Sequence, residues 1–214
     1  MSAEVYGTIT ASEAADEYLG MGIDRSRCGR FLKLTQLGLV KKILDKYPVK
    51  AGKHCRSPAG DDIFDEKEEL GEPVSRTEYM GLVMTLMYIA RLTRPDILMV
   101  VTYLATRSHC ATTRDWKYCM RVVRYLSDNQ EIGITMHCTS LQVRIWADAS
   151  YAAHSDGKGH TGYIIYLGDS YVHARSGKQK LQGTSSTDAE IIAAVEAVKM
   201  AVWLREVLRE REFH

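Results

Sequence analysis

The run Ile145-Trp146-Ala147-Asp148-Ala149-Ser150-Tyr151 indicates the fold of this chain more clearly than any other stretch. Its apolar residues predict a β-strand that leads to Asp148, and the small residues that follow leave room for a ligand. Further along, Ser185-Ser186-Thr187-Asp188-Ala189-Glu190-Ile191 predicts the start of a helix with Glu190 in its opening turns. Carboxylates on rigid elements bind divalent metals, and such metals promote phosphodiester cleavage. Asp148 and Glu190 therefore form a candidate metal site.

Each carboxylate also has an ordinary structural explanation. If Thr187 is the N-cap of the helix, Glu190 is the third residue of a capping box. If Ser185 is the N-cap instead, Asp188 takes the capping role and Glu190 is free to face a metal. Asp148 alone could be a turn residue at the end of a strand. Spacing by itself favours these structural roles, because structural carboxylates are common.

The composition is that of a globular protein. The chain has 214 residues, of which 45% are hydrophobic and 26% charged, so it can bury one substantial core or two modest ones. Lysine and arginine number 28 against 27 acidic residues, which gives a net charge of +1. Because the whole molecule has almost no net field, a polyanion would have to bind at a local basic patch.

The cysteines and the apolar runs bear on localisation. The five cysteines are an odd set without CxxC spacing, which favours a reducing compartment. Three of them directly follow histidine, but neighbouring residues seldom both bind one metal, so coincidence is favoured over a zinc site. No basic-then-apolar leader opens the chain, and the runs 81–90 and 97–101 are too short to span a bilayer. We expect an intracellular protein, cytoplasmic or nuclear, that is neither secreted nor membrane-bound.

The N-terminal part predicts one hairpin and one helix. Residues 1–17 carry no signal for a fixed structure. A hairpin is expected over 18–33, with one strand over 18–23 and a polar turn through 24–29. Thr35 is the expected N-cap of a helix to about Tyr47, which Pro48 closes. Residues 48–75, with their acidic run, are expected to form a loop or linker.

Three helical patterns follow. Ser75 and Glu78 form a capping-box signature for a helix to about Leu92, and Pro95 opens a second helix to about Arg107. Thr112 or Thr113 caps a third helix to about Ser127. This third helix carries a basic stripe on one face, formed by Arg114, Lys117, Arg121 and Arg124, opposite Trp116, Met120 and Val123. Such a stripe suits a phosphate backbone, although on this pattern alone an ordinary solvated face is favoured.

The last third of the chain changes to the period of strands. Strands are expected over 132–138, 141–147, 161–167 and 171–175, with the clearest turn at Asp156-Gly157-Lys158-Gly159. One long helix is then expected from about Ser186 to Arg211.

Several motifs in this last third occur together in a known family. They are Ala147-Asp148-Ala149-Ser150-Tyr151-Ala152, Lys158-Gly159-His160-Thr161-Gly162-Tyr163, Ser176-Gly177-Lys178-Gln179-Lys180 and Ser185-Ser186-Thr187-Asp188-Ala189-Glu190. In order and spacing, this part resembles the RNase H domain of copia-type LTR retrotransposon Pol polyproteins. Upstream, Tyr18-Leu19-Gly20 resembles the segment after the polymerase active site, and the Leu34-Thr35-Gln36 helix resembles the thumb. Further stretches resemble the connector, namely 79–90, Thr93-Arg94-Pro95-Asp96-Ile97 and Arg121-Val122-Val123-Arg124-Tyr125-Leu126.

The resemblance implies a fold and a division of the chain. The fold is α/β, an incomplete RNase H-like mixed sheet with a long helix, preceded by a mainly helical thumb and connector. The segments are a flexible N-terminus (1–17), a palm-end and thumb-like segment (18–74), a helical connector (75–130) and a truncated RNase H-like domain (131–214).

The resemblance also implies roles for single residues. Asp148 and Glu190 would be the first and second metal-binding carboxylates of a catalytic site that holds two Mg²⁺ ions in the intact family. Lys178 and Lys180, in the loop before the helix, are candidates for contacts to an RNA–DNA hybrid. For the basic stripe, the resemblance makes binding of nucleic acid and an ordinary solvated face equally favoured.

The departures from the family pattern imply a reduced activity. The family's third and fourth carboxylates would follow the long helix, and this sequence ends first. Ser150 stands where a second acidic residue is common, and Gly159 where serine is usual. The polymerase aspartates have no counterpart in residues 1–17, so no polymerase activity is expected of this chain by itself. Without the next strand, the strand that carries Asp148 becomes a sheet edge that could pair with a partner or aggregate. Two carboxylates hold an ion pair about 4 Å apart poorly, so metal binding and catalysis should be weak.

Two functional hypotheses of different classes follow. In the first, the chain is a fragment of a copia-type Pol protein whose intact parent cleaves RNA in RNA–DNA hybrids with Mg²⁺. In the second, it is a non-catalytic nucleic-acid-binding or interaction module derived from a retroelement, in which the basic residues act and the carboxylates are idle. The expected partners are nucleic acid and the remainder of a Pol polyprotein. A degenerate product without a selected role is a third possibility.

Overall fold

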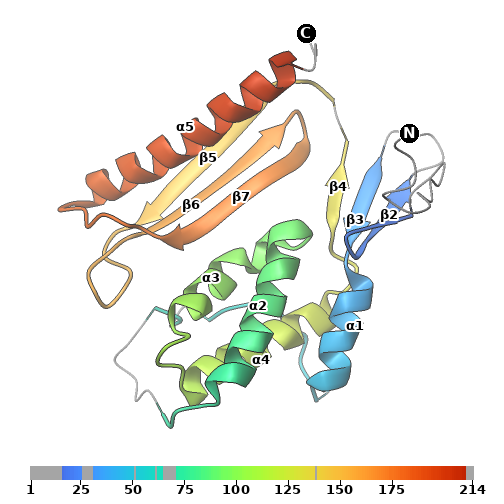
Figure 1. Ribbon diagram of the computed structural model, residues 1–214, viewed down its shortest axis with the longest axis vertical. Coiled ribbons are helices and arrows are strands. Elements are labelled where there is room, and N and C mark those ends of the chain that lie inside the picture. Colours follow the sequence, from blue (N-terminus) through green and yellow to red (C-terminus); the bar gives the residue numbers. More distant parts are fainter. Residues whose placement is uncertain are drawn as a thin grey trace, which may run out of the picture.

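Two antiparallel sheets and a group of helices make up the described part of the chain (Figure 1). The computed structural model describes residues 16–25, 31–50, 52–60, 62–64, 71–137 and 139–210. The buried hydrophobic residues form a large cluster within the helices and a small one between the second sheet and the last helix. The chain is therefore α/β, as expected, with two cores.

The first sheet has the strand order β1-β2-β3-β4, and every pair is antiparallel. Its strands are β1 (Glu17–Tyr18), β2 (Met21–Arg25), β3 (Leu32–Thr35) and β4 (Ile134–Met136). The predicted hairpin is present, but the single strand predicted over 18–23 is wrong. The chain turns at Leu19 and Gly20, which have φ values of 51° and 71°. Glycine makes this left-handed conformation accessible, and the hydrophobic pattern did not reveal it. Most of the predicted N-terminal tail and of the turn 24–29 lies outside the described residues.

Two connections to this sheet differ from the sequence prediction. Thr35, the expected N-cap, belongs to β3, and Gln36 is the N-cap of helix α1 (Leu37–Lys46). Strand β4 pairs with β3 through Leu34 and Ile134, whereas residues 132–138 were grouped with the strands that follow. This pairing joins segments far apart in sequence, so no local pattern could reveal it.

The central helices begin close to their predicted caps. They are α2 (Arg76–Leu92), the 3₁₀ turn η1 (Pro95–Ile97), α3 (Leu98–Thr106) and α4 (Thr113–Asp128). Ser75 caps α2, where its side chain accepts from the Glu78 N–H. Thr112 is the N-cap of α4, and its N–H donates to the Asp115 carboxylate over 2.9 Å. These starts were predictable because capping is local chemistry.

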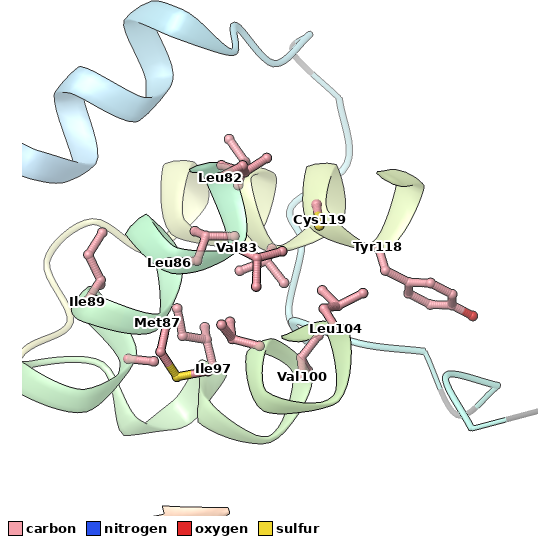
Figure 2. Close-up of a cluster of buried hydrophobic side chains, with 14 of the residues drawn as sticks. Leu82, Val83, Leu86, Met87, Ile89, Ile97, Val100, Leu104, Tyr118 and Cys119 are labelled. Atoms are coloured by element: carbon pink, nitrogen blue, oxygen red, sulfur yellow. The ribbon is translucent and has the colours of Figure 1, made fainter. Parts of the chain in front are cut away.

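The large core lies where α2, α3 and α4 meet, as Figure 2 shows. Leu86, Ile97 and Leu104 are fully buried there, one from each of α2, η1 and α3. Cys119 of α4 lies in the same cluster, and burial raises the pKa of its thiol to about 12. The side chain is thus a neutral, packed thiol, which is its commonest role in a core.

The second sheet carries the candidate metal site. It has the order β5-β6-β7, from β5 (Val143–Ser150), β6 (His160–Leu167) and β7 (Ser170–Lys178). Both pairings are antiparallel, so the mixed sheet expected from the sequence is wrong for the described residues. The reason is connectivity, because the connections of nine residues (151–159) and two residues (168–169) contain no crossover helix, which a parallel pair would need. Helix α5 (Ser186–Glu210) covers one face of this sheet and contacts β5 and β6 (Figure 1).

Small residues let α5 approach the sheet closely. Ala189, Ala193 and Ala197 are buried at intervals of four along one helix face, where Ala197 packs near Tyr163 and Ile165. On the other face of the sheet, α3 contacts β7, and the Thr102 hydroxyl lies 3.3 Å from the Ser176 hydroxyl. The sheet is therefore a layer between α5 and the helical group.

In the described part of the chain, no helix is long and apolar enough to cross a membrane.

Candidate functional site

Asp148 lies on β5, at the edge of the second sheet. It is opposite Gly162 of β6, and the strand continues past it to Ser150. Because successive strand residues point to opposite faces, Asp148 shares a face with Trp146. That face is turned away from α5, since Val143 and Ile145 pack on the helix side. Within the described residues β5 pairs only with β6, so the expected open edge is confirmed. The Asp148 side chain is exposed at this edge.

Glu190 lies in the first turns of α5 and takes no part in capping. The Asp188 N–H donates to the Ser185 hydroxyl over 3.2 Å, which makes Ser185 the N-cap. The Asp188 carboxylate accepts from the N–H and hydroxyl of Thr184 over 2.8 and 2.6 Å. These bonds, the Thr184 hydroxyl foremost, lower the pKa of Asp188. Of the two alternatives, capping by Ser185 is therefore the correct one, and Glu190 is exposed to solvent.

The flank of α5 that carries Glu190 lies above the open edge of the sheet. On the opposite flank, Glu196 forms an ion pair with Arg175 of β7, with 2.9 Å between the Arg175 Nε and the Glu196 Oε2. Glu190 is six residues earlier, about 240° around the helix, with the buried alanines between them. The Tyr151 hydroxyl donates to the Thr184 carbonyl over 3.3 Å, which ties the end of β5 to the start of α5. Both carboxylates thus belong to elements that meet at this end of the edge strand.

A buried glutamine fixes this corner of the sheet. Gln179 follows β7, and its side-chain amide donates to the Thr161 hydroxyl over 3.1 Å and to the Ala189 carbonyl over 3.0 Å. It thereby joins β6 to the first turn of α5. A Cβ added at Gly159 would lie 2.5 Å from the Gln179 side-chain oxygen and 2.9 Å from the Ser150 carbonyl. Glycine is therefore needed there, because any side chain would meet both groups at too short a distance.

A hollow of about 670 Å³ borders Asp148 on the side of the helical group. Its lining includes Trp146, Met99 and Ser176, together with a second carboxylate, Asp96. Asp96 is already engaged, because it accepts from the Arg94 guanidinium over 2.8 Å and from the Tyr125 hydroxyl over 2.9 Å. Across the described ranges, no three His, Cys, Asp or Glu side chains are grouped so that they could hold one metal ion. Asp148 and Glu190 therefore belong to no larger cluster of metal-binding side chains within the described residues.

The two candidate lysines differ in their surroundings. Lys178 is the last residue of β7, and its ammonium group lies 2.8 Å from the Asp156 carboxylate. This hydrogen bond is the main reason that the pKa of Asp156 is lowered. The expected place of Lys178 in the loop before the helix is thus wrong, because β7 extends three residues past its expected end at Arg175. Lys180 does lie in that connection and is exposed.

The basic stripe of α4 lines one side of a hollow of about 970 Å³. Three of its arginines also hold the segment that precedes α2. Arg114 donates to the Asp62 carbonyl over 2.9 Å, Arg121 to the Ser57 carbonyl over 3.3 Å, and Arg124 to the Lys53 carbonyl over 2.9 Å. Lys117 is exposed on the same face.

The opposite wall of this hollow adds basic residues that the sequence analysis did not select. They are Lys50, Lys53, His54 and Arg56. These four basic residues lie close together in the sequence, which could have indicated a basic surface. The pattern of residues 48–75 instead predicted a loop or linker. The hollow is thus lined by cationic side chains from two segments. Such a cradle suits a phosphate-rich ligand better than a single helix face does.

The comparisons with known proteins place these observations in a family. An antiparallel sheet with a long helix across it is consistent with an RNase H-like fold. The chain is 30% identical over 206 residues to the retrovirus-related Pol polyprotein from transposon RE2 of Arabidopsis thaliana, and 29% identical over 208 residues to that from transposon TNT 1-94 of Nicotiana tabacum. Each match covers 94% of this chain. The chain belongs to the retrovirus-related Pol polyproteins of copia-type transposons.

The matched polyproteins are much longer than this chain. The chain spans 14% of the RE2 polyprotein and 16% of the TNT 1-94 polyprotein, so it corresponds to a segment of them. Residues of this chain also match the secreted RxLR effector protein 161 of Plasmopara viticola, at 32% identity over 128 residues, 59% of this chain and 90% of that protein. No protein-family model matches the chain, and no solved structure matches it significantly.

Proposed function

We propose that this chain is the part of a copia-type Pol polyprotein that contributes the first two carboxylates of an RNase H site. In the intact polyprotein this site would cleave RNA in RNA–DNA hybrids. The observation that supports the proposal best is that Asp148 and Glu190 lie on two elements that are tied together at the open edge of the sheet, through Tyr151 and Thr184. A match over 94% of the chain to transposon Pol polyproteins supports the same lineage on independent grounds.

The donor set fits magnesium. Mg²⁺ prefers hard oxygen ligands and keeps several water molecules, and two exposed carboxylates supply ligands without excluding water. Bound Mg²⁺ would supply Lewis-acid activation of a water molecule and of the scissile phosphate. Asp148 would ligate from the edge strand and Glu190 from the helix, while Lys180 and Lys178 would face the backbone of the hybrid. Because two carboxylates hold a pair of ions poorly, the 214-residue chain tested by itself should cleave slowly or not at all.

Metal binding can be tested separately from cleavage. Trp146 is two residues before Asp148 and on the same face of β5, so its fluorescence should report ligation there. We expect Mg²⁺ or Mn²⁺ to change the emission of the chain, and Asp148→Asn and Glu190→Gln each to abolish the change. Glu206→Gln, an exposed glutamate of the same helix, is the matched control and should behave as wild type. Metal binding that survives both substitutions would contradict the proposal.

Cleavage of a labelled RNA–DNA hybrid completes the test. Any Mg²⁺-dependent cleavage should be lost in Asp148→Asn, since a carboxamide does not neutralise the ion. Cleavage that Asp148→Asn leaves unchanged would come from another site or from a contaminant.

A second function, binding of nucleic acid without cleavage, is favoured by the basic hollow between α4 and residues 50–56. Here the carboxylates have no role. We expect binding of a hybrid or of single-stranded RNA to weaken steeply with salt and to be indifferent to Asp148→Asn. Lys117→Ala and Lys53→Ala should each weaken binding, because they remove cations from opposite walls. Binding that is insensitive to salt and to both substitutions would exclude the hollow.

A further inference from the structure

The outer face of α5 carries an apolar stripe that nothing in the described structure covers. Ile191, Val195, Val198 and Val202 are 56%, 47%, 54% and 44% exposed. They lie on the side of the helix away from the buried alanines, and Figure 1 shows no other element beyond that side. Single exposed apolar residues are ordinary, but a continuous row of four on one helix marks an interaction surface.

The spacing of the stripe is that of a helix-pairing seam. The intervals between the four residues are four, three and four, which is the alternation of a heptad repeat. The same alternation continues by one position at each end, to Asp188 before the stripe and to Arg205 after it. The seam therefore begins with an acid, continues with four apolar residues and ends with a base, over about 26 Å of helix.

The acid–apolar–base order of residues along the seam is complementary to the same order in a helix that runs the opposite way. A second copy of α5 that runs antiparallel places its Val198 against Val195 and its Val202 against Ile191. In the same register its Arg205 meets Asp188, and its Asp188 meets Arg205. A parallel copy would instead place acid on acid and base on base. Two-fold symmetry requires a self-complementary surface of this kind.

The charged ends are suitable for such pairing. Asp188 is held in its ionised form, because the Thr184 hydroxyl and N–H lower the pKa of its carboxyl. Arg205 is exposed, and among the described residues its ion pair is with its neighbour Glu206, over 3.1 Å. Pairs at the rim of an interface add little affinity but fix orientation and register.

We propose that the chain forms a two-fold dimer in which α5 packs antiparallel on α5 of a second copy, with the two sheets on the outside. The occupant of the stripe is thus another copy of this chain, and the inference is independent of any nuclease activity. A single helix pair is smaller than a standard interface, so the dissociation constant should be on the order of micromolar.

Sedimentation velocity of the full chain over a wide concentration range tests the dimer. The wild type should pass from monomer to dimer, and Val195→Glu or Val198→Lys should each raise the dissociation constant by about tenfold or more, since each buries an unpaired charge. Leu181→Glu is the control, because Leu181 is 68% exposed and lies before the helix. Circular dichroism confirms that each variant is folded.

A mixing experiment tests the orientation. In an antiparallel dimer of one Val195→Glu chain with one Val198→Lys chain, the glutamate of one copy faces the lysine of the other. The mixture should therefore dimerise more tightly than either variant alone. In a parallel dimer the two new charges face valines, and mixing restores nothing. A wild type that stays monomeric, or a dimer that Val198→Lys leaves intact, would overturn the proposal.

Discussion

At the scale of single residues, Arg94 has the most demanding surroundings in the helical group. Its side chain is 2% exposed, yet it carries a full charge. Its guanidinium binds Asp96 through Nε and Nη2, donates to the Asn129 carbonyl over 2.8 Å, and lies 5.4 Å from the centre of the Tyr125 ring. It thereby joins the start of η1 to the end of α4. This network gives a physical reason for the Thr93-Arg94-Pro95-Asp96-Ile97 motif.

Replacing this arginine with lysine should therefore be costly. Arg94→Lys keeps the charge but loses the planar fork, so the free energy of unfolding should fall by about 2–4 kcal/mol. Urea denaturation measures the change. Arg91→Lys, an exposed arginine three residues earlier, is the control and should change stability by less than about 0.5 kcal/mol. Equal effects of the two substitutions would show that the buried network contributes nothing.

Gln179 provides a second test at this scale. Its amide joins Thr161 of β6 to the Ala189 carbonyl of α5, and the side chain is 2% exposed. Gln179→Ala should lower the free energy of unfolding by about 1–3 kcal/mol, because it leaves buried polar groups without their partner. Gln182→Ala, an exposed glutamine of the same connection, should be nearly neutral. Thermal unfolding compares the two variants directly.

The candidate site illustrates what single residues reveal in a sequence. Asp148 and Glu190 were identified from their residue types and their places on expected elements. The choice between Ser185 and Thr187 as N-cap was left open, because it depends on how the connection after β7 approaches the helix. Gln179 and the closeness of Gly159 to it could not be predicted, since they arise where three segments meet.

At the scale of elements, the basic stripe of α4 contains residues with two different structural roles. Arg124 donates to two carbonyl groups of the segment before α2 and lies 3.7 Å from the Asp128 carboxylate, whereas Lys117 is exposed on the same face. A helix-wheel pattern treats them alike. Their contacts assign Arg124 to holding the opposite wall of the basic hollow, and leave Lys117 available to a ligand.

The two roles can be separated by substitution. Lys117→Ala should leave thermal stability unchanged and reduce the affinity for a nucleic-acid probe at low salt. Arg124→Ala should also release the wall, so that limited proteolysis cuts faster within residues 48–60. The comparison of both variants in both assays is the measurement. If Lys117→Ala accelerated proteolysis as much as Arg124→Ala, the contacts of Arg124 would not hold the wall.

Elements themselves were predictable where their signals are local. The helix starts at Ser75 and Thr112 lie where the sequence indicated, because the cap and its partner are three residues apart. The strands failed where pairing is remote. Strand β4 joins the first sheet through β3, roughly a hundred residues earlier, and no period or turn residue records that choice.

At the scale of the whole molecule, a buried polar cluster joins the second sheet to the helical group. His154 and His160 lie 3.0 Å apart through their ring nitrogens, and His160 is 2.6 Å from the Ser176 hydroxyl. Phe64 and Tyr103 of the helical side contact these rings. The sequence pattern indicates no role for these histidines, because their pairing exists only once the sheet is docked. They make this junction sensitive to protonation.

The junction should weaken in mild acid. Burial, with the neighbouring His154 second, lowers the pKa of His160 from 6.5 to about 4, and the pKa of His173 is lowered in the same direction. The unfolded chain therefore binds more protons than the folded chain between about pH 6.5 and pH 4. By linkage, the free energy of unfolding is unaffected by His160 above this window and falls by roughly 1 kcal/mol per pH unit as the pH drops through it.

Denaturant unfolding at a series of pH values measures this slope. His160→Gln, which does not titrate, should flatten the profile between pH 6.5 and pH 4, although it lowers stability at pH 7 through the lost contacts. His109→Gln is the matched control for the loss of one histidine, because His109 is exposed to solvent. A wild-type profile that is flat over this range would mean that the histidine pair accepts protons without loosening the junction. The buried contacts of His160 with Ser176 and Phe64 argue against that, since a charge added to this ring would be removed from water.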